Sequence, residues 1–268
     1  MTQGNNTGAP DSPLVSDRNF DDLAERFRKT IYDTPKGQLR LGALKADFAE
    51  LDIPVNQQPV LDLGGGQAQF SHWLASQHDA EIHLCDVSAD MIRLAEERFK
   101  TSSMPLKAVC CPLQSAHEHF HQTYPVVLNH AVLEWLEHPF DALKQIGDFV
   151  APDGWLSLMF YNLHGHQWRQ LMNGRTHAPT SANQRLREEG NSPQHPLDPD
   201  SIFSALESLG FTIKRWRGIR CIHDHMHQKI RERIGQEAVN KADLEFGLQD
   251  PYRLFGRYIH VLAQRQAG

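Results

Sequence analysis

The chain has little cysteine and no long apolar run. Four of its 268 residues are cysteine, and no two of them have the CxxC spacing typical of zinc and redox motifs. A disulfide framework and a cysteine-based metal site are therefore not expected. No stretch reaches the roughly 18 consecutive apolar residues of a membrane-spanning helix, and no basic-then-apolar segment opens the sequence. We expect a cytoplasmic protein with no membrane partner.

The chain also lacks an overall excess of positive charge, but its two halves differ. The formal net charge is −6. Residues 1–160 hold 12 Lys and Arg against 22 Asp and Glu, whereas residues 161–235 hold 11 against 7. An anionic partner, if there is one, should therefore meet the second half of the chain. A randomly mixed surface is the alternative.

What the chain does have is a regular alternation of apolar strands and helical segments. Residues 1–14 are rich in Gly, Asn and Pro and are expected to be a disordered tail. Residues 15–268 are expected to form a single α/β domain, a mostly parallel sheet with helices on both faces. Residues 162–196 and 220–250 interrupt the pattern, and we interpret them as insertions on the substrate side. The expected strands are 60–63, 81–86, 106–111, 124–130, 152–160, 211–216 and 256–263.

A glycine-rich turn follows the first expected strand, in Val60-Leu61-Asp62-Leu63-Gly64-Gly65-Gly66. Glycines let backbone N–H groups approach a ligand, and the next helix points its positive end at the same place. Asp86 ends the second expected strand, 20 residues beyond Gly66. An acid there can reach the ribose of a ligand whose remaining parts lie over the glycine turn. The alternative is that Asp86 caps the helix that begins near Ser88.

Asp62-Leu63-Gly64-Gly65-Gly66, Asp86 and the turn Pro152-Asp153-Gly154 resemble class I S-adenosylmethionine-dependent methyltransferases. The resemblance covers about residues 35–220 and implies a Rossmann-like, seven-stranded fold with S-adenosyl-L-methionine as cofactor. It departs from the family pattern at Ala68, where a further glycine is common. The acid at Asp62 would repel a pyrophosphate but suits a cationic cofactor.

A closer resemblance spans nearly the whole chain from Arg18. The segments that carry it are 17–22, 36–40, 130–135, 157–162 and 256–261, and they resemble bacterial tRNA methyltransferases that esterify the carboxylate of 5-carboxymethoxyuridine at the wobble position. The resemblance implies the tRNA anticodon loop as partner. It also implies cofactor contacts at Arg40, Gly64, Gly65, Asp86, Leu113, Gln114 and His130. The guanidinium of Arg40 would then match the carboxylate of the cofactor's amino-acid part.

This chemistry needs no catalytic base in the protein. A carboxylic acid with a pKa near about 4 is already ionised at neutral pH, so proximity and alignment can supply the catalysis. The substrate carboxylate still needs a cationic seat, for which we favour Arg220, with Arg257 second. Tyr161 and Asn162 end the fifth expected strand and are expected to form the pocket wall.

Other interpretations stay open. His223-x-His225-x-His227 invites a metal site, but positions i, i+2 and i+4 of a helix do not share one face, so we expect no metal. The chain could instead be a small-molecule carboxyl methyltransferase, with residues 162–196 and 220–250 as a lid. A third interpretation is a non-catalytic RNA-binding protein that senses the cofactor. The oligomeric state and the tRNA species are not evident from the sequence.

Overall fold

The structure is a computed structural model that describes residues 34–51, 53–55, 58–102, 104–175, 193 and 195–267. The tail predicted at residues 1–14, and residues 176–192 of the expected insertion, lie outside this range. In the described residues the predicted α/β fold is confirmed as a seven-stranded sheet with the order β3-β2-β1-β4-β5-β7-β6. The strands are β1 (Val60–Leu63), β2 (Ile82–Asp86), β3 (Leu106–Cys110), β4 (Tyr124–His130), β5 (Val150–Tyr161), β6 (Phe211–Ile219) and β7 (Tyr258–Arg265).

Strands β1 to β5 pair with one another in parallel, and β7 runs antiparallel to both β5 and β6. The strand order reverses between β1 and β4, because β1 also pairs with β2. Ligands of open α/β sheets bind at the carboxyl ends of the strands beside such a reversal. The ends of β1, β2, β4 and β5 therefore mark where a site is expected.

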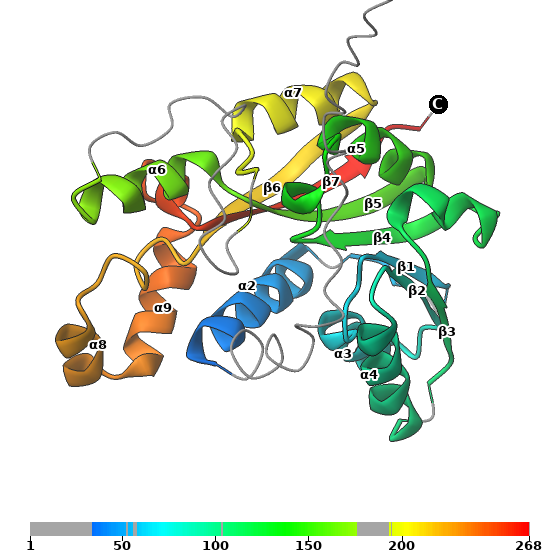
Figure 1. Cartoon of the computed structure of the whole chain (residues 1–268), viewed down its shortest axis with the longest axis horizontal. Helices are drawn as coiled ribbons and strands as arrows, with labels where there is room; N and C mark the ends of the chain where they lie inside the picture. Colours follow the sequence, from blue (N-terminus) through cyan, green and yellow to red (C-terminus); the bar gives the residue numbers. More distant parts are fainter. Residues whose placement is uncertain are drawn as a thin grey trace, which may run out of the picture.

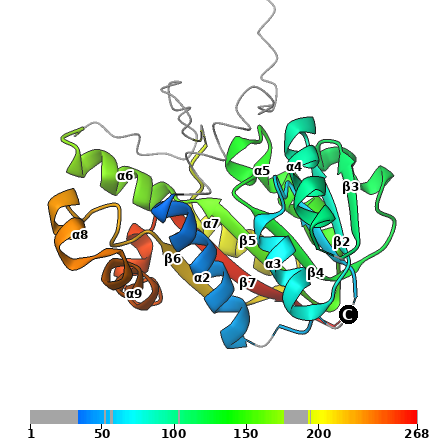
Figure 2. The same cartoon turned by 90° about the horizontal axis from the view of Figure 1, so that it is seen from below.

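Helices cover both faces of the sheet (Figures 1 and 2). One face carries α2 (Pro35–Leu51), α3 (Gln69–His78) and α4 (Ala89–Lys100), and the other carries α5 (Pro139–Asp148) and α7 (Pro199–Ser208). Each face has its own buried apolar cluster: Leu44, Phe70 and Leu74 belong to the first, and Leu143 and Ile202 to the second. The sheet is thus buried on both sides, as its near-continuous apolar strands predict.

Three further helices lie together beyond β5 and β6, at one end of the molecule (left in Figure 1). They are α6 (Leu163–Met172), α8 (Gln228–Ile234) and α9 (Gln236–Phe246). Short 3₁₀ helices η3 (Leu113–Glu118), η4 (Leu133–Trp135) and η5 (Tyr252–Phe255) connect the larger elements. Helix α6 lies where weak apolar periodicity suggested a break in the pattern. The Asn162 side chain caps it by accepting a hydrogen bond from the His164 N–H at 3.0 Å.

None of the helices in the described ranges is long and apolar enough to cross a membrane.

Candidate functional site

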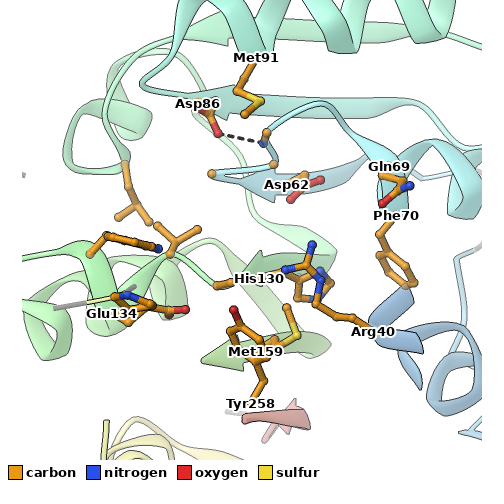
Figure 3. Close-up of a pocket in the computed structure, with 18 of the residues that line it drawn as sticks. Arg40, Asp62, Gln69, Phe70, Asp86, Met91, His130, Glu134, Met159 and Tyr258 are labelled. Carbon is orange, nitrogen blue, oxygen red and sulfur yellow. Dashed lines mark hydrogen bonds between the residues drawn. The ribbon is translucent and has the colours of Figure 1, made fainter. Parts of the chain in front are cut away.

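A cavity of about 550 Å³ opens at the carboxyl ends of β1, β2 and β4, beneath helix α2. In Figure 3, Asp62 and Asp86 lie on the upper side of this cavity, Tyr258 on the lower side, Glu134 at the left, and His130 and Arg40 toward the centre and right. Every cofactor-site residue predicted from the sequence lines the cavity: Arg40, Asp62, Gly64, Gly65, Asp86, Leu113, Gln114 and His130. Residues far apart in the chain are therefore brought together as predicted, while their contacts with a cofactor stay a prediction.

The glycine turn is built so that no side chain fits at its first two glycines. Gly64 has φ +72°, and a Cβ there would lie 2.4 Å from Cγ2 of Val132. A Cβ on Gly65 would lie 2.6 Å from the Asp62 carboxyl carbon. Ala68, which replaces the glycine common in related turns, has φ 56° and is buried. The turn keeps its left-handed conformation at Ala68 despite the Cβ, which costs roughly 1 kcal/mol.

Asp86 ties this turn to the end of β2. One carboxylate oxygen accepts the Gly66 N–H at 2.8 Å (Figure 3), and the other accepts the Ser88 N–H at 3.0 Å. Helix α4 is capped by Ser88, whose hydroxyl accepts from the Met91 N–H. Asp86 thus holds the glycine turn and the loop between β2 and α4 together, while its side chain also lines the cavity. The alternative interpretation, in which Asp86 caps helix α4, agrees only with its contact to the Ser88 N–H, because the residue that caps the helix is Ser88.

Two buried acids face the cavity. Burial raises the pKa of Asp62 to about 7, with the nearby Asp86 charge adding to the shift and the Ser71 hydroxyl opposing it. Glu134, in η4, is fully buried, and in the described structure neither of its carboxylate oxygens has a hydrogen-bond partner. Burial raises its pKa to about 8, while nearby N–H groups and Arg40 oppose the shift. A buried carboxyl without such a partner is costly, so Glu134 is a candidate for a functional role.

Sequence reasoning did not single out Glu134. The available signal was an acid inside the apolar run Ala131-Val132-Leu133-Glu134-Trp135-Leu136, directly after the fourth strand.

His130 and Arg40 meet between the two acidic positions. Burial lowers the pKa of His130 well below its usual value, and the charges of His260 and Arg40 add to this. The His130 ring packs edge-on against Phe70, with 5.2 Å between the ring centroids. Arg40 projects from α2, and its guanidinium carbon lies 6.0 Å from the centroid of the Tyr258 ring. A neutral imidazole and a guanidinium therefore lie side by side in the cavity wall.

Four cationic side chains line the part of the cavity nearest α6 and the β6–α8 loop. We call Lys36, Arg169, Arg220 and Arg257 the cationic wall. Burial lowers the pKa of Lys36, and the charges of Arg220, Arg257 and Arg169 lower it further, against Asp224. Such mutual effects show that the four charges act on one another across a small space. Arg220 and Arg257 were predicted from the sequence, whereas Lys36 and Arg169 were missed.

Asp224 neutralises part of this wall. Arg220 binds it through two nitrogens, Nε to Oδ1 at 3.0 Å and Nη2 to Oδ2 at 2.6 Å, and Arg257 Nη1 lies 3.6 Å from Oδ2. Burial alone would raise the pKa of Asp224, but the hydrogen bond with His223 and the two arginines hold it well below its usual range. No ion pair of Lys36 or Arg169 occurs within the described residues. The wall therefore keeps an excess of positive charge that can bind an anion.

Tyr161 and Asn162 were predicted to bind the substrate as part of the pocket wall, and the structure places them behind that wall. Both are buried, and neither lines the cavity. The Tyr161 hydroxyl shares a 2.9 Å hydrogen bond with Nδ1 of His166, and Arg257 lies over its ring. The Asn162 amide donates to the carbonyls of Leu254 and Gly256. These contacts turn the end of β5 into α6, so the two residues support the wall from behind.

The three histidines of the His-x-His-x-His segment do not converge. His223 pairs with Asp224, His225 Nε2 contacts the carbonyl of Phe255, and the His227 side chain caps α8. Across the described ranges, no group of three or more His, Cys, Asp or Glu side chains is placed to hold a metal ion.

Comparison with known proteins gives a consistent result. A family model for a methyltransferase domain matches residues 61–156. The tRNA 5-carboxymethoxyuridine methyltransferases of Escherichia coli K12 and O157:H7 are each 34% identical to this chain over 255 residues, which cover 94% of this chain and 97% of the relative.

Solved structures with a similar fold include two methyltransferases. Magnesium protoporphyrin IX methyltransferase from Synechocystis PCC 6803, solved with bound SAH, aligns with a TM-score of 0.63 and 14% identity over 92% of this chain and 96% of its own. A putative S-adenosylmethionine-dependent methyltransferase from Listeria monocytogenes aligns with a TM-score of 0.60 and 15% identity over 85% of this chain and 99% of its own. At these identities the two structures support the fold alone.

Proposed function

This chain belongs to the tRNA 5-carboxymethoxyuridine methyltransferase family, and on that basis we propose that it methylates the carboxylate of 5-carboxymethoxyuridine at the wobble position of tRNA. The methyl donor is S-adenosylmethionine, and the product is the methyl ester. We expect the enzyme to act in the cytoplasm on the anticodon loop.

The glycine-turn side of the cavity suits this cofactor. Asp86 lies at the end of β2, where an acid can accept hydrogen bonds from ribose hydroxyls. Leu113 and Gln114 follow β3 and lie where a base ring would rest. Arg40 offers a guanidinium for an amino-acid carboxylate, and Asp62 offers a buried carboxyl to a cation. When bound, S-adenosylmethionine supplies an electrophilic methyl group on a positively charged sulfur.

The single observation that carries the substrate assignment is the cationic wall in the same cavity. A substrate carboxylate there finds Arg220 and Arg257, with Lys36 and Arg169 beside them. Because the carboxylate is already ionised at neutral pH, the protein needs to hold and aim it rather than remove a proton. The fork of Arg220 also binds Asp224, so Lys36 and Arg169 supply the uncompensated positive charge that would hold such a carboxylate in place.

The surface of α6 favours RNA over a small metabolite. Trp168, Leu171 and Met172 are exposed on this helix, and Arg169 of the cationic wall projects from the same helix. Trp168 is held against Phe255, with 4.9 Å between ring centroids. An exposed, fixed aromatic ring beside arginines suits unstacked bases of an RNA loop. A free metabolite does not require such a surface.

The direct test incubates the purified protein with S-adenosylmethionine and tRNA that contains 5-carboxymethoxyuridine, followed by mass spectrometry of the nucleosides. The expected product is the methyl ester of that nucleoside. The free nucleoside and tRNA with unmodified uridine serve as controls. Equal methylation of the free nucleoside would support the small-molecule interpretation instead. Cofactor binding without methylation of either substrate would support the non-catalytic one.

A further inference from the structure

A continuous chain of buried hydrogen bonds leads from the cavity to helix α2. Nε2 of His130 lies 2.8 Å from the Ser157 hydroxyl, which in turn lies 2.9 Å from Nε2 of His260. Nδ1 of His260 lies 2.8 Å from Oδ2 of Asp47. Ser157, His260 and Asp47 are buried, and none of them lines the cavity. We call these four residues the polar chain.

The sheet register places the polar chain beneath α2. His130 of β4 is in register with Met159 of β5, which is in register with His260 of β7. Ser157 precedes Met159 by two residues and so projects from the same face of the sheet. Arg217 of β6 is in register with His260, and its Nε donates to Oδ1 of Asp47 at 2.9 Å. Asp47 therefore joins α2 to β6 and β7, and it is the last residue of the polar chain.

The hydrogen-bond direction along the chain follows from Asp47. Burial would raise the pKa of Asp47, but the hydrogen bonds from His260 and Arg217 and the positive charge around the carboxylate lower it overall, so the group is an ionised acceptor. Nδ1 of His260 must then carry a proton and donate it. If His260 is neutral, its Nε2 accepts from the Ser157 hydroxyl, and the Ser157 oxygen accepts from Nε2–H of His130. That leaves Nδ1 of His130 as an acceptor.

The reverse direction would require a charged His260, which would be a third cation next to Asp47. Arg217 already pairs with Asp47 at 2.8 Å, and Arg215 lies 3.5 Å away, with Glu50 balancing it at the surface. His260 is buried among these groups with no further carboxylate in contact within the described residues. Charging it would place a third cation against the two acids Asp47 and Glu50, so that one positive charge in this buried group would have no acid to balance it. The neutral arrangement is therefore favoured.

We propose that Ser157, His260 and Asp47 are positioning residues that fix His130 with Nδ1 as a hydrogen-bond acceptor for the ammonium group of the cofactor's amino-acid part. This inference rests on the proposed function, because it assumes the cofactor seat described above. Arg40 lies two helical turns before Asp47 on α2. The same helix thus presents Arg40 to the carboxylate of that amino acid and anchors the chain that orients His130 toward its ammonium group.

The test uses a matched pair of variants, Ser157→Thr and Ser157→Val. The two side chains have nearly the same size, but only Thr keeps a hydroxyl that can connect His130 with His260. Isothermal titration calorimetry then measures the affinity for S-adenosylhomocysteine and for its analogue without the amino group. We expect Ser157→Val to bind S-adenosylhomocysteine about tenfold more weakly than Ser157→Thr, a loss typical of a hydrogen bond to a charged group. The deaminated analogue should bind both variants alike.

A second measurement reports the tautomer without any ligand. Nitrogen-15 NMR of the ligand-free protein should show His130 protonated at Nε2 and unprotonated at Nδ1, and this preference should weaken in Ser157→Val. Protonation at Nδ1 in the native protein would overturn the inference, as would equal losses for the two ligands in Ser157→Val. If the native protein binds S-adenosylhomocysteine and methylates tRNA while the two variants behave alike, this inference alone fails. If it binds no S-adenosylhomocysteine, the proposed function fails as well.

Discussion

The buried acid Glu134 makes the stability of the ligand-free protein depend on pH in a direction that can be worked out. Its pKa in the folded chain is about 8, against a usual value of 4.5. Folding therefore favours the protonated form. The stability from this group is fully present below pH 4.5 and is lost as the pH rises through about 8. At about 1.4 kcal/mol per pH unit, the whole loss is about 5 kcal/mol.

Replacing Glu134 with Gln keeps the shape and removes the titration. Between pH 5 and pH 8.5 the native protein should lose about 4 kcal/mol of unfolding free energy relative to Glu134→Gln. Asp62 titrates in both proteins, so its contribution cancels in the comparison. Urea unfolding at several pH values measures the difference, and Glu96→Gln on the exposed side of α4 is the control. A gap between native protein and Glu134→Gln that stays constant with pH would refute the reasoning.

Four further predictions concern the cavity. Affinity for S-adenosylmethionine should rise with pH through about 7, because the cationic cofactor favours the ionised form of Asp62. Calorimetry in buffers of different ionisation enthalpy should detect a proton released on binding, and the Asp62→Asn variant should not release it. Gly64→Ala should lower the unfolding free energy by roughly 1–3 kcal/mol, and the additional change Val132→Ala should restore part of it in thermal melts. Asp86→Ala should weaken S-adenosylhomocysteine binding about tenfold or more by calorimetry; unchanged affinity would contradict its assigned role. Arg220→Ala should raise the KM for tRNA about tenfold and leave cofactor affinity within about twofold, and an equal loss of both would count against a substrate role.

That the residues of the glycine-turn side would line one cavity could be predicted from the sequence, because most of that side is built from short-range patterns. A strand, a glycine turn and a helix occupy one continuous segment, and Asp86 follows at a spacing that the parallel pairing of β1 and β2 requires. The substrate side was harder to predict. Lys36 and Arg169 belong to α2 and α6, and they meet Arg220 and Arg257 only because the chain folds back across the sheet. No local spacing in the sequence links either residue to Arg220 or Arg257.

Tyr161 and Asn162 show why a strand end alone is an incomplete signal. The end of the strand lies where it was expected, since β5 ends at Tyr161. What the sequence did not reveal is that α6 begins immediately and that η5 packs against it. Asn162 is used to satisfy the carbonyls of that connection. Buried backbone carbonyls need partners, and a side chain that supplies them is no longer available to a ligand.

The polar chain could not be predicted for a related reason. Asp47 and His260 are 213 residues apart in sequence, and no local spacing links them. Each would be interpreted alone as an ordinary polar residue in an amphipathic segment. They meet because β7 inserts antiparallel between β5 and β6, which places His260 next to Arg217 and under α2. The connection follows from topology rather than from local sequence.

The separation of charge across the cavity bears on turnover as well as binding. Asp62 and Asp86 lie on the side proposed for a cationic cofactor, and the cationic wall lies on the side proposed for an anionic substrate. In the proposed reaction both reactants lose their reacting charge: the sulfonium becomes a thioether, and the carboxylate becomes an ester. Each wall then holds its product less strongly than its reactant, because the Coulomb attraction that drew the reactant in has gone. The same charges that bring the reactants together therefore favour the release of both products.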